Sequence, residues 1–136
     1  MFDLPSRSYK DDKTIAAIDL GSNSFHMVIG KEENGQFIII DRLREPVRLG
    51  EGIDRNKQLD PIVGRRALDC LERFKQRLSG IPRDCVRAVG TNTMRQIDDD
   101  SEFYHQAINA LGYDIEVISG SEEARLVYLG VTHGLE

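Results

Sequence analysis

The segment from Asp19 to Ser24 carries the groups of an anion-binding turn. It reads Asp-Leu-Gly-Ser-Asn-Ser and separates two apolar, β-prone runs. Gly21 can adopt positive φ, and backbone N–H groups together with the side chains of Ser22, Asn23 and Ser24 could cradle a phosphate. The same residue types are also the ordinary content of a hairpin turn. The turn alone therefore leaves both interpretations open.

Two later segments offer similar chemistry. The segment Gly90 to Arg95 reads Gly-Thr-Asn-Thr-Met-Arg, and the segment Ser119 to Glu123 reads Ser-Gly-Ser-Glu-Glu. Turn chemistry explains each segment separately, but it does not explain why all three should offer glycine, hydroxyls and further polar or charged groups. Because convergent polar groups mark ligand sites, we expect the three segments to meet at one site.

Charged side chains in these segments are candidates for phosphate chemistry. Arg95 could present a planar, permanently charged guanidinium to phosphate oxygens, or it could be a solvated arginine after a strand. Ser119 and Glu122 have the spacing of a capping box, which explains Glu122. Glu123 has no capping role and could orient or deprotonate a water, although the helix dipole also explains a glutamate there. Asp19 is a candidate for orienting a metal ion or water.

The elements that must position these segments follow an α/β order. Alternating apolar residues and the Asn34-Gly35 turn predict a three-stranded antiparallel meander, and Asp60 followed by Pro61 predicts a helix start. Gly80 fits the end of that helix, and residues 44–59 look like an irregular connection. The predicted elements are strands over 14–19, 24–31 and 36–43, a helix over 61–79, a strand over 85–89, a helix over 102–111, a strand over 114–118 and a helix over 122–131.

This βββαβαβα order predicts a ribonuclease-H-like α/β fold. We expect a mixed five-stranded sheet with helices on both faces, in which the first, fourth and fifth strands are parallel. Open α/β sheets bind ligands outside the carboxyl ends of such strands. The three polar segments follow these three strands, so the fold would bring them together. Residues 1–13 are expected to be a disordered tail before one domain over 14–136.

Composition excludes several classes of protein. A net charge of −5 over 136 residues argues against a chain that binds nucleic acid or an anionic membrane as a whole. No apolar run approaches the ~20 residues of a membrane span, and residues 1–13 lack a signal-peptide core, so we expect a cytoplasmic protein. Neither the cysteines nor the histidines have the spacing of a metal site; they are Cys70, Cys85, His26, His105 and His133. We interpret these thiols as buried and the histidines as structural or solvent-facing.

The polar segments together resemble one family. The stretches Ala17 to Met27, Gly90 to Gln96 and Ile118 to Leu126 are similar, in order and spacing, to the exopolyphosphatase/guanosine pentaphosphate phosphatase family. That family belongs to the superfamily of actin-like, sugar-kinase and heat-shock-chaperone ATPases. The resemblance implies Mg²⁺-assisted hydrolysis of terminal phosphoanhydride bonds in inorganic polyphosphate, guanosine pentaphosphate or both. It also implies a cytoplasmic homodimer connected, through guanosine pentaphosphate, with the stringent response.

The resemblance also assigns roles to individual residues. It implies that Asn23 and Ser24, with the rest of the turn from Gly21, hold phosphate, that Arg95 contacts the phosphate chain, and that Glu123 positions the hydrolytic water. No metal ligand set is assignable within the chain.

The family's second phosphate loop, an Asp-Ile-Gly-Gly-Gly-Ser-type turn on a second lobe, has no counterpart before Glu136. We therefore expect residues 14–136 to be the first lobe of an actin-like ATPase-type phosphatase domain, inactive alone. The alternative is an ATP-binding lobe of an actin-like kinase or chaperone, in which the same hairpin holds ATP phosphates.

Overall fold

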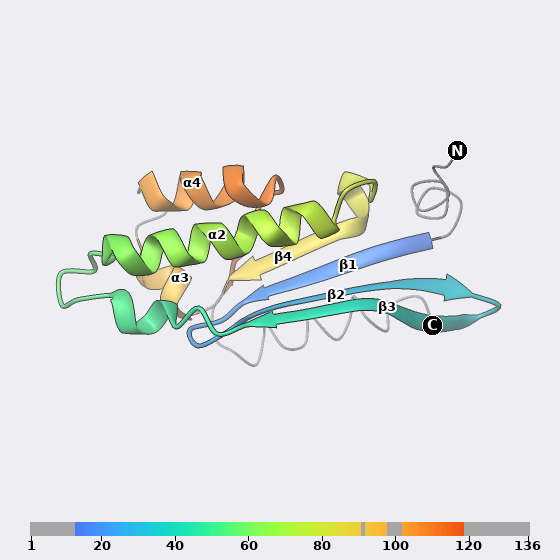
Figure 1. Ribbon diagram of the computed structural model, residues 1–136, viewed down its shortest axis with the longest axis horizontal. Coiled ribbons are helices and arrows are strands. Elements are labelled where there is room, and N and C mark those ends of the chain that lie inside the picture. The colour runs from blue at the N-terminus through green and yellow to red at the C-terminus, as the bar shows by residue number, and fades with distance from the viewer. Residues whose placement is uncertain (1–12, 91, 98–101, 119–136) are drawn as a thin grey trace.

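Five strands form one mixed sheet in the order β3-β2-β1-β4-β5 (Figure 1). The computed structural model describes residues 13–90, 92–97 and 102–118. The strands are β1 (Lys13–Leu20), β2 (Phe25–Glu33), β3 (Gln36–Glu45), β4 (Val86–Gly90) and β5 (Glu116–Val117). The predicted mixed five-stranded α/β sheet is confirmed.

The meander follows from the turn chemistry of the sequence. Strand β1 pairs antiparallel with β2, and β2 pairs antiparallel with β3. Between β2 and β3, Asn34 and Gly35 have φ values of 56° and 80°. Two consecutive positive φ values are the signature of a type I′ hairpin turn, whose twist matches that of the flanking strands. The predicted hairpin at Asn34-Gly35 is confirmed.

The parallel strands end side by side. Strand β1 runs parallel to β4, and β4 runs parallel to β5. Leu20 pairs with Gly90, and Gly90 pairs with Val117, so the last residues of the three strands are level. The segments that follow β1 and β4 therefore start from the same edge of the sheet, as predicted.

Strands β4 and β5 do not have the predicted bounds, which were 85–89 and 114–118. Strand β4 begins at Val86 because the N–H of Cys85 bonds to the carbonyl of Pro82 and closes the 3-10 turn η2 (Arg83–Cys85). Strand β5 is shorter than the predicted 114–118, because the carbonyl of Ile115 accepts a hydrogen bond from the hydroxyl of Tyr104, at 2.8 Å.

Helices α2 (Pro61–Arg77) and α4 (Glu102–Leu111) lie side by side on one face of the sheet (Figure 1). The carboxylate of Asp60 accepts the N–H of Ile62 at 2.9 Å, which confirms the predicted cap. The chain leaves α2 through Gly80, which has a φ of 90°. The helix predicted over 122–131 lies outside the described residues. The prediction of helices on both faces of the sheet depended on that helix. Within the described ranges, no helix is long and apolar enough to cross a membrane.

The core lies between this helical layer and the sheet. Its largest buried side chains include Ile18 and Phe25 from the sheet and Phe74 from α2, and burying each contributes about 1.5–3 kcal/mol. Ala17 and Val28 project from the opposite face of β1 and β2 and are also buried. The centre of the sheet is therefore covered on both faces, which explains why β1 is apolar on both faces.

Two segments predicted as irregular contain short helices. One is the 3-10 helix η1 (Leu49–Gly52), inside the predicted connection, and the other is α3 (Asn92–Gln96), which directly follows β4. Leu49 is fully buried, and so are Met94 and Ile97 of the second segment. The prediction of plain loops was wrong because these apolar residues anchor both segments to the core.

Candidate functional site

The first polar turn is closed by its own backbone. The N–H of Gly21 donates to the carbonyl of Ser24 at 3.1 Å, directly after the last β1–β2 pair. Gly21 does not adopt the positive φ that its residue type allows. Glycine is favoured here by close approach, because an added Cβ would lie 3.2 Å from the carbonyl oxygen of Ser24. The side chain of Ser24 is buried, so Ser24 contributes to the turn mainly through its backbone.

The turn presents unpaired donors at the sheet edge. Within the described part of the chain, the backbone N–H groups of Ser22 and Asn23 have no hydrogen-bond acceptor. Asn23 is exposed and Ser22 is half-buried, so both N–H groups lie in a turn that solvent reaches. Unpaired, consecutive N–H groups in a turn form a nest for anions. The turn therefore offers two adjacent backbone donors at the edge of the sheet.

A hydrogen bond between side chains joins this turn to the segment after β4. The hydroxyl of Ser22 contacts the hydroxyl of Thr93, which lies on α3 and is 4% exposed. The structure therefore brings together the first two of the three predicted segments. Helix α3 also carries the backbone of Arg95 to this edge, while the side chain of Arg95 and the whole third segment, Ser119 to Glu123, lie outside the described part.

Another stretch of the chain, which was not predicted from the sequence, holds the turn in place. The N–H of Arg48 donates to the carbonyl of Asn23 at 2.8 Å, and the N–H of Gly50 donates to the carbonyl of Ser22 at 3.0 Å. We call residues 47–50 the strap. A Cβ added at Gly50 would lie 3.4 Å from both Ser22 Cβ and Thr93 Oγ1, so the strap passes close to the hydroxyl pair.

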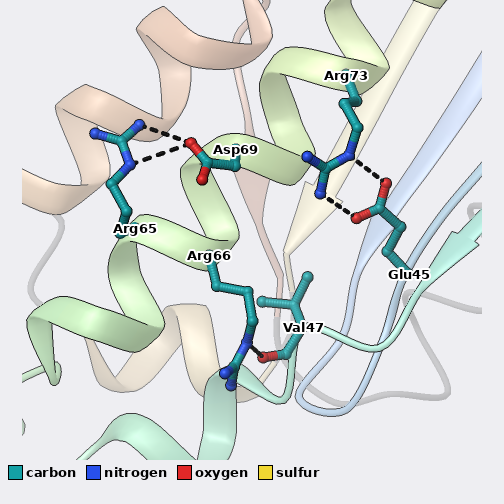
Figure 2. Close-up of polar contacts among 6 residues, drawn as sticks. All are labelled: Glu45, Val47, Arg65, Arg66, Asp69 and Arg73. Atoms are coloured by element: carbon teal, nitrogen blue, oxygen red, sulfur yellow. Dashed lines mark hydrogen bonds and ion pairs between the residues drawn. The ribbon is translucent and has the colours of Figure 1, made fainter.

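Helix α2 fastens the strap to the body of the protein. Figure 2 shows Arg66 donating through Nε to the carbonyl of Val47, at 2.8 Å. About two helical turns after Arg66, Arg73 donates to both carboxylate oxygens of Glu45 at the end of β3. The hydrogen bonds from Arg73 hold the pKa of Glu45 below its usual value. The position of the turn thus depends on contacts that begin on a helix more than 40 residues later.

Asp19 lies next to the turn, and it is half-buried. It precedes the last residue of β1, and its Oδ1 atom is buried without a hydrogen-bond partner among the described residues. Desolvation raises the pKa of Asp19, and the neighbouring His26 opposes that rise. His26 is paired with Asp19 across the β1–β2 ladder, so their side chains share a face. His26, predicted from the sequence to be structural or solvent-facing, therefore lies beside a candidate site residue.

The donor set at Asp19 fits one kind of metal site. Within the described ranges, no three His, Cys, Asp or Glu side chains gather as a metal site. Mg²⁺ is usually held by one or two carboxylates together with substrate phosphate oxygens and water. A single carboxylate with an unpartnered oxygen, beside a phosphate-type turn, meets that requirement.

The largest described cavity lies elsewhere. It has a volume of about 510 Å³ and sits between the start of α2 and α4, where Leu59, Leu68 and Phe103 line it. Of the predicted site residues whose side chains the structure describes, which all lie between Asp19 and Ser24, none lines this cavity.

Comparisons with known proteins identify a family. The model of the Ppx/GppA phosphatase family matches residues 8–136. A Haemophilus influenzae protein, whose name assigns it provisionally to the exopolyphosphatases, is 44% identical over 121 residues, which cover 89% of this chain and 38% of that protein.

Solved structures show the same fold. The crystal structure of an Aquifex aeolicus Ppx/GppA protein matches with a TM-score of 0.73 and 27% identity, over 87% of this chain and 39% of that one. An exopolyphosphatase from Cytophaga hutchinsonii matches with a TM-score of 0.73 and 30% identity, over 87% of this chain and 38% of that one. This chain spans less than two fifths of the length of each of these relatives.

Proposed function

Because this chain belongs to the Ppx/GppA phosphatase family, we propose that the whole protein hydrolyses terminal phosphoanhydride bonds. The proposed substrates are inorganic polyphosphate, guanosine pentaphosphate or both, and the chain supplies the first lobe of the enzyme. The observation that carries the proposal is the edge of the sheet, where the unpaired N–H groups of Ser22 and Asn23 lie beside Thr93 on the helix that carries Arg95.

Each group at this edge has a distinct proposed task. The N–H groups of the turn and the guanidinium of Arg95 stabilise the negative charge that develops on the transferred phosphoryl group. Ser22 adds a hydroxyl donor. Glu123, the second glutamate of the third segment, orients the attacking water and accepts its proton. Glu122, whose spacing from Ser119 matches a capping box, is proposed to take no part in the chemistry.

Asp19 is the proposed metal-holding residue of this lobe. Two observations support this role: its Oδ1 atom has no protein partner within the described part of the chain, and Asp19 directly precedes the last residue before the turn. A bound Mg²⁺ ion would supply charge neutralisation at the phosphate oxygens. Asp19 in turn keeps a hard, anionic oxygen at the edge of the sheet for that purpose.

The remainder of the catalytic site is proposed to come from a second lobe. The match covers 38% of its Haemophilus influenzae relative, so about three fifths of the relative's length has no counterpart here. A phosphate loop and carboxylates on a second lobe would close over the turn and exclude water. We propose that the 136-residue chain alone has no significant turnover, and that the whole protein is a cytoplasmic homodimer.

Phosphate release by the whole protein tests the substrate class. We expect inorganic phosphate to be released from long polyphosphate, from guanosine pentaphosphate or from both, at rates well above the rate with ATP. A kinase or chaperone lobe with the same fold would instead turn over or tightly bind ATP. Turnover of ATP together with inactivity on both other substrates would contradict the proposal.

A further inference from the structure

We propose that Thr93 is a positioning residue that acts on bound phosphate through the hydroxyl of Ser22. This inference rests on the proposed function, because it takes the turn from Gly21 to Ser24 as the phosphate-binding element. It adds a residue from a different segment, whose role is to set the direction in which Ser22 donates.

Thr93 is held more firmly than the serine it contacts. It is 4% exposed, and its carbonyl accepts the N–H of Ile97 at 3.2 Å. Met94 is buried against Gly90, where an added Cβ would lie only 2.7 Å from Met94 Cγ. The backbone of Ser22 is also held, since its carbonyl accepts the N–H of Gly50 at 3.0 Å, but Ser22 is only half-buried at the tip of a turn. The more deeply buried threonine side chain therefore restrains the serine side chain.

The number of protons on the two hydroxyls determines which of them donates the hydrogen bond. Each hydroxyl has one proton to donate and can also accept a hydrogen bond. When a phosphate oxygen lies at the turn, Ser22 must donate its proton to that anion. Its oxygen then accepts the bond from Thr93, which gives a chain from Thr93 Oγ1 through Ser22 Oγ to phosphate. Such chains strengthen each member and hold the terminal donor in one rotamer.

The backbone of the turn does not depend on Thr93. The bond from Gly21 to Ser24 and the two bonds from Arg48 and Gly50 hold it independently. Removing the threonine hydroxyl should therefore release the Ser22 side chain without unfolding the turn. This separation makes the positioning role testable.

The variants for the test are chosen by shape. In the whole protein, Thr93→Val removes the hydroxyl and keeps the volume, Thr93→Ala is a second variant without the hydroxyl, and Thr93→Ser restores it. Thr14→Val is the matched control. Thr14 is also buried, but its hydroxyl has no partner within the described ranges, and it lies at the opposite end of β1.

The readouts are kcat/KM for phosphate release from long polyphosphate and guanosine pentaphosphate, and the Kd for inorganic triphosphate. We expect Thr93→Val and Thr93→Ala to lower kcat/KM and weaken triphosphate binding by roughly tenfold, as loss of a hydrogen bond to a charged group would. Thr93→Ser should stay within about twofold of wild type, and Thr14→Val should match wild type. Because Thr93 acts through Ser22, the double variant Ser22→Ala/Thr93→Val should equal Ser22→Ala alone.

Several outcomes would overturn the inference. One is wild-type behaviour of both Thr93→Val and Thr93→Ala. Another is a loss in Thr14→Val equal to that in Thr93→Val. The third is a double variant whose loss is the product of the losses in Ser22→Ala and Thr93→Val. A wild-type protein that releases no phosphate from either substrate refutes the proposed function instead. In that case the Kd for triphosphate alone tests whether Thr93 acts through Ser22. A wild-type protein that binds no triphosphate refutes both the proposed function and the role of Thr93.

Discussion

The hydroxyls of Ser22 and Thr93 share a hydrogen bond although 71 positions separate them in the chain. The bond joins the ends of two level strands, since Leu20, two residues before Ser22, pairs with Gly90, three residues before Thr93. It therefore ties the turn after β1 to the helix after β4 at the point where a ligand of an α/β sheet binds. The proposed site depends on this connection and on the strap beside it.

Substitution of Gly90 should damage the site more than the fold. An added Cβ would lie 2.7 Å from Met94 Cγ and 2.9 Å from Met94 Cβ, so Gly90→Ala must push α3 away from β4. We expect a loss of about 1–3 kcal/mol in the free energy of unfolding, as for other overpacked sites. Because α3 carries Thr93 and Arg95, kcat/KM should fall at least about tenfold, the factor expected for one lost charged hydrogen bond.

Gly64→Ala in α2 is the control for Gly90→Ala. Its Cβ would lie 3.3 Å from the flexible end of Leu59 and 3.7 Å, an ordinary contact, from Phe103 Cδ1, and alanine is favoured over glycine inside a helix by up to about 1 kcal/mol. The control should keep full activity and equal or higher stability. Full activity in Gly90→Ala would show that the position of α3 does not matter.

Asp19→Asn should stabilise the protein and inactivate it. Desolvation raises the pKa of Asp19, so its ionised form costs stability at neutral pH, and the buried Oδ1 atom has no protein partner among the described residues. A neutral amide removes that cost. Activity should fall by roughly 10²-fold, since charge neutralisation by a bound metal contributes several kcal/mol. Thermal unfolding with a chelator present and phosphate release without it measure the two effects. A variant with lower stability and full activity would contradict the role of Asp19.

Glu45→Gln should show a pH-dependent loss of stability. Arg73 lowers the folded-state pKa of Glu45, so the stabilisation is present above the usual carboxyl pKa and disappears as pH falls through the lower, folded-state value. Because both side chains are partly exposed, we expect a loss of only about 0.5–1 kcal/mol at pH 7. Near pH 2 the variant and wild type should be equally stable.

Asp69→Asn gives the comparison for Glu45→Gln. The Arg65–Asp69 pair, at 3.1 Å on the exposed side of α2, should contribute at most about 0.5 kcal/mol (Figure 2). Denaturant unfolding at the two pH values measures both variants. A Glu45→Gln loss of the same size at low pH would show that packing, and not the charge on Glu45, is responsible.

Local chemistry predicted those parts of the fold that short segments determine. The Asp60-Pro61 pair marked the start of α2, and Asn34-Gly35 marked the hairpin, because a cap and a type I′ turn are each satisfied within a few residues. The level ends of β1 and β4 followed from the order of elements. The meeting of the first two polar segments was predicted for the same reason.

Parts of the site that depend on distant contacts were not predicted. The strap holds the turn by backbone hydrogen bonds from Arg48 and Gly50, and such bonds leave no side-chain pattern in the sequence. Helix α3 was missed because its apolar signal is only Met94 and Ile97, two residues in a polar segment. Thr93 was recognised as polar, but its partner, Ser22, could be identified only from the structure.

The central claim is that the whole protein hydrolyses phosphoanhydrides at this edge of the sheet, with Glu123 orienting the water. The most direct measurement is kcat for phosphate release from long polyphosphate and from guanosine pentaphosphate, in wild type, Glu123→Gln and Glu122→Gln. The two variants make the same change of charge at adjacent positions. We predict a loss of roughly 10²–10⁴-fold for Glu123→Gln, as for removal of a general base, and near wild-type kcat for Glu122→Gln. Wild-type kcat in Glu123→Gln on both substrates would contradict the account.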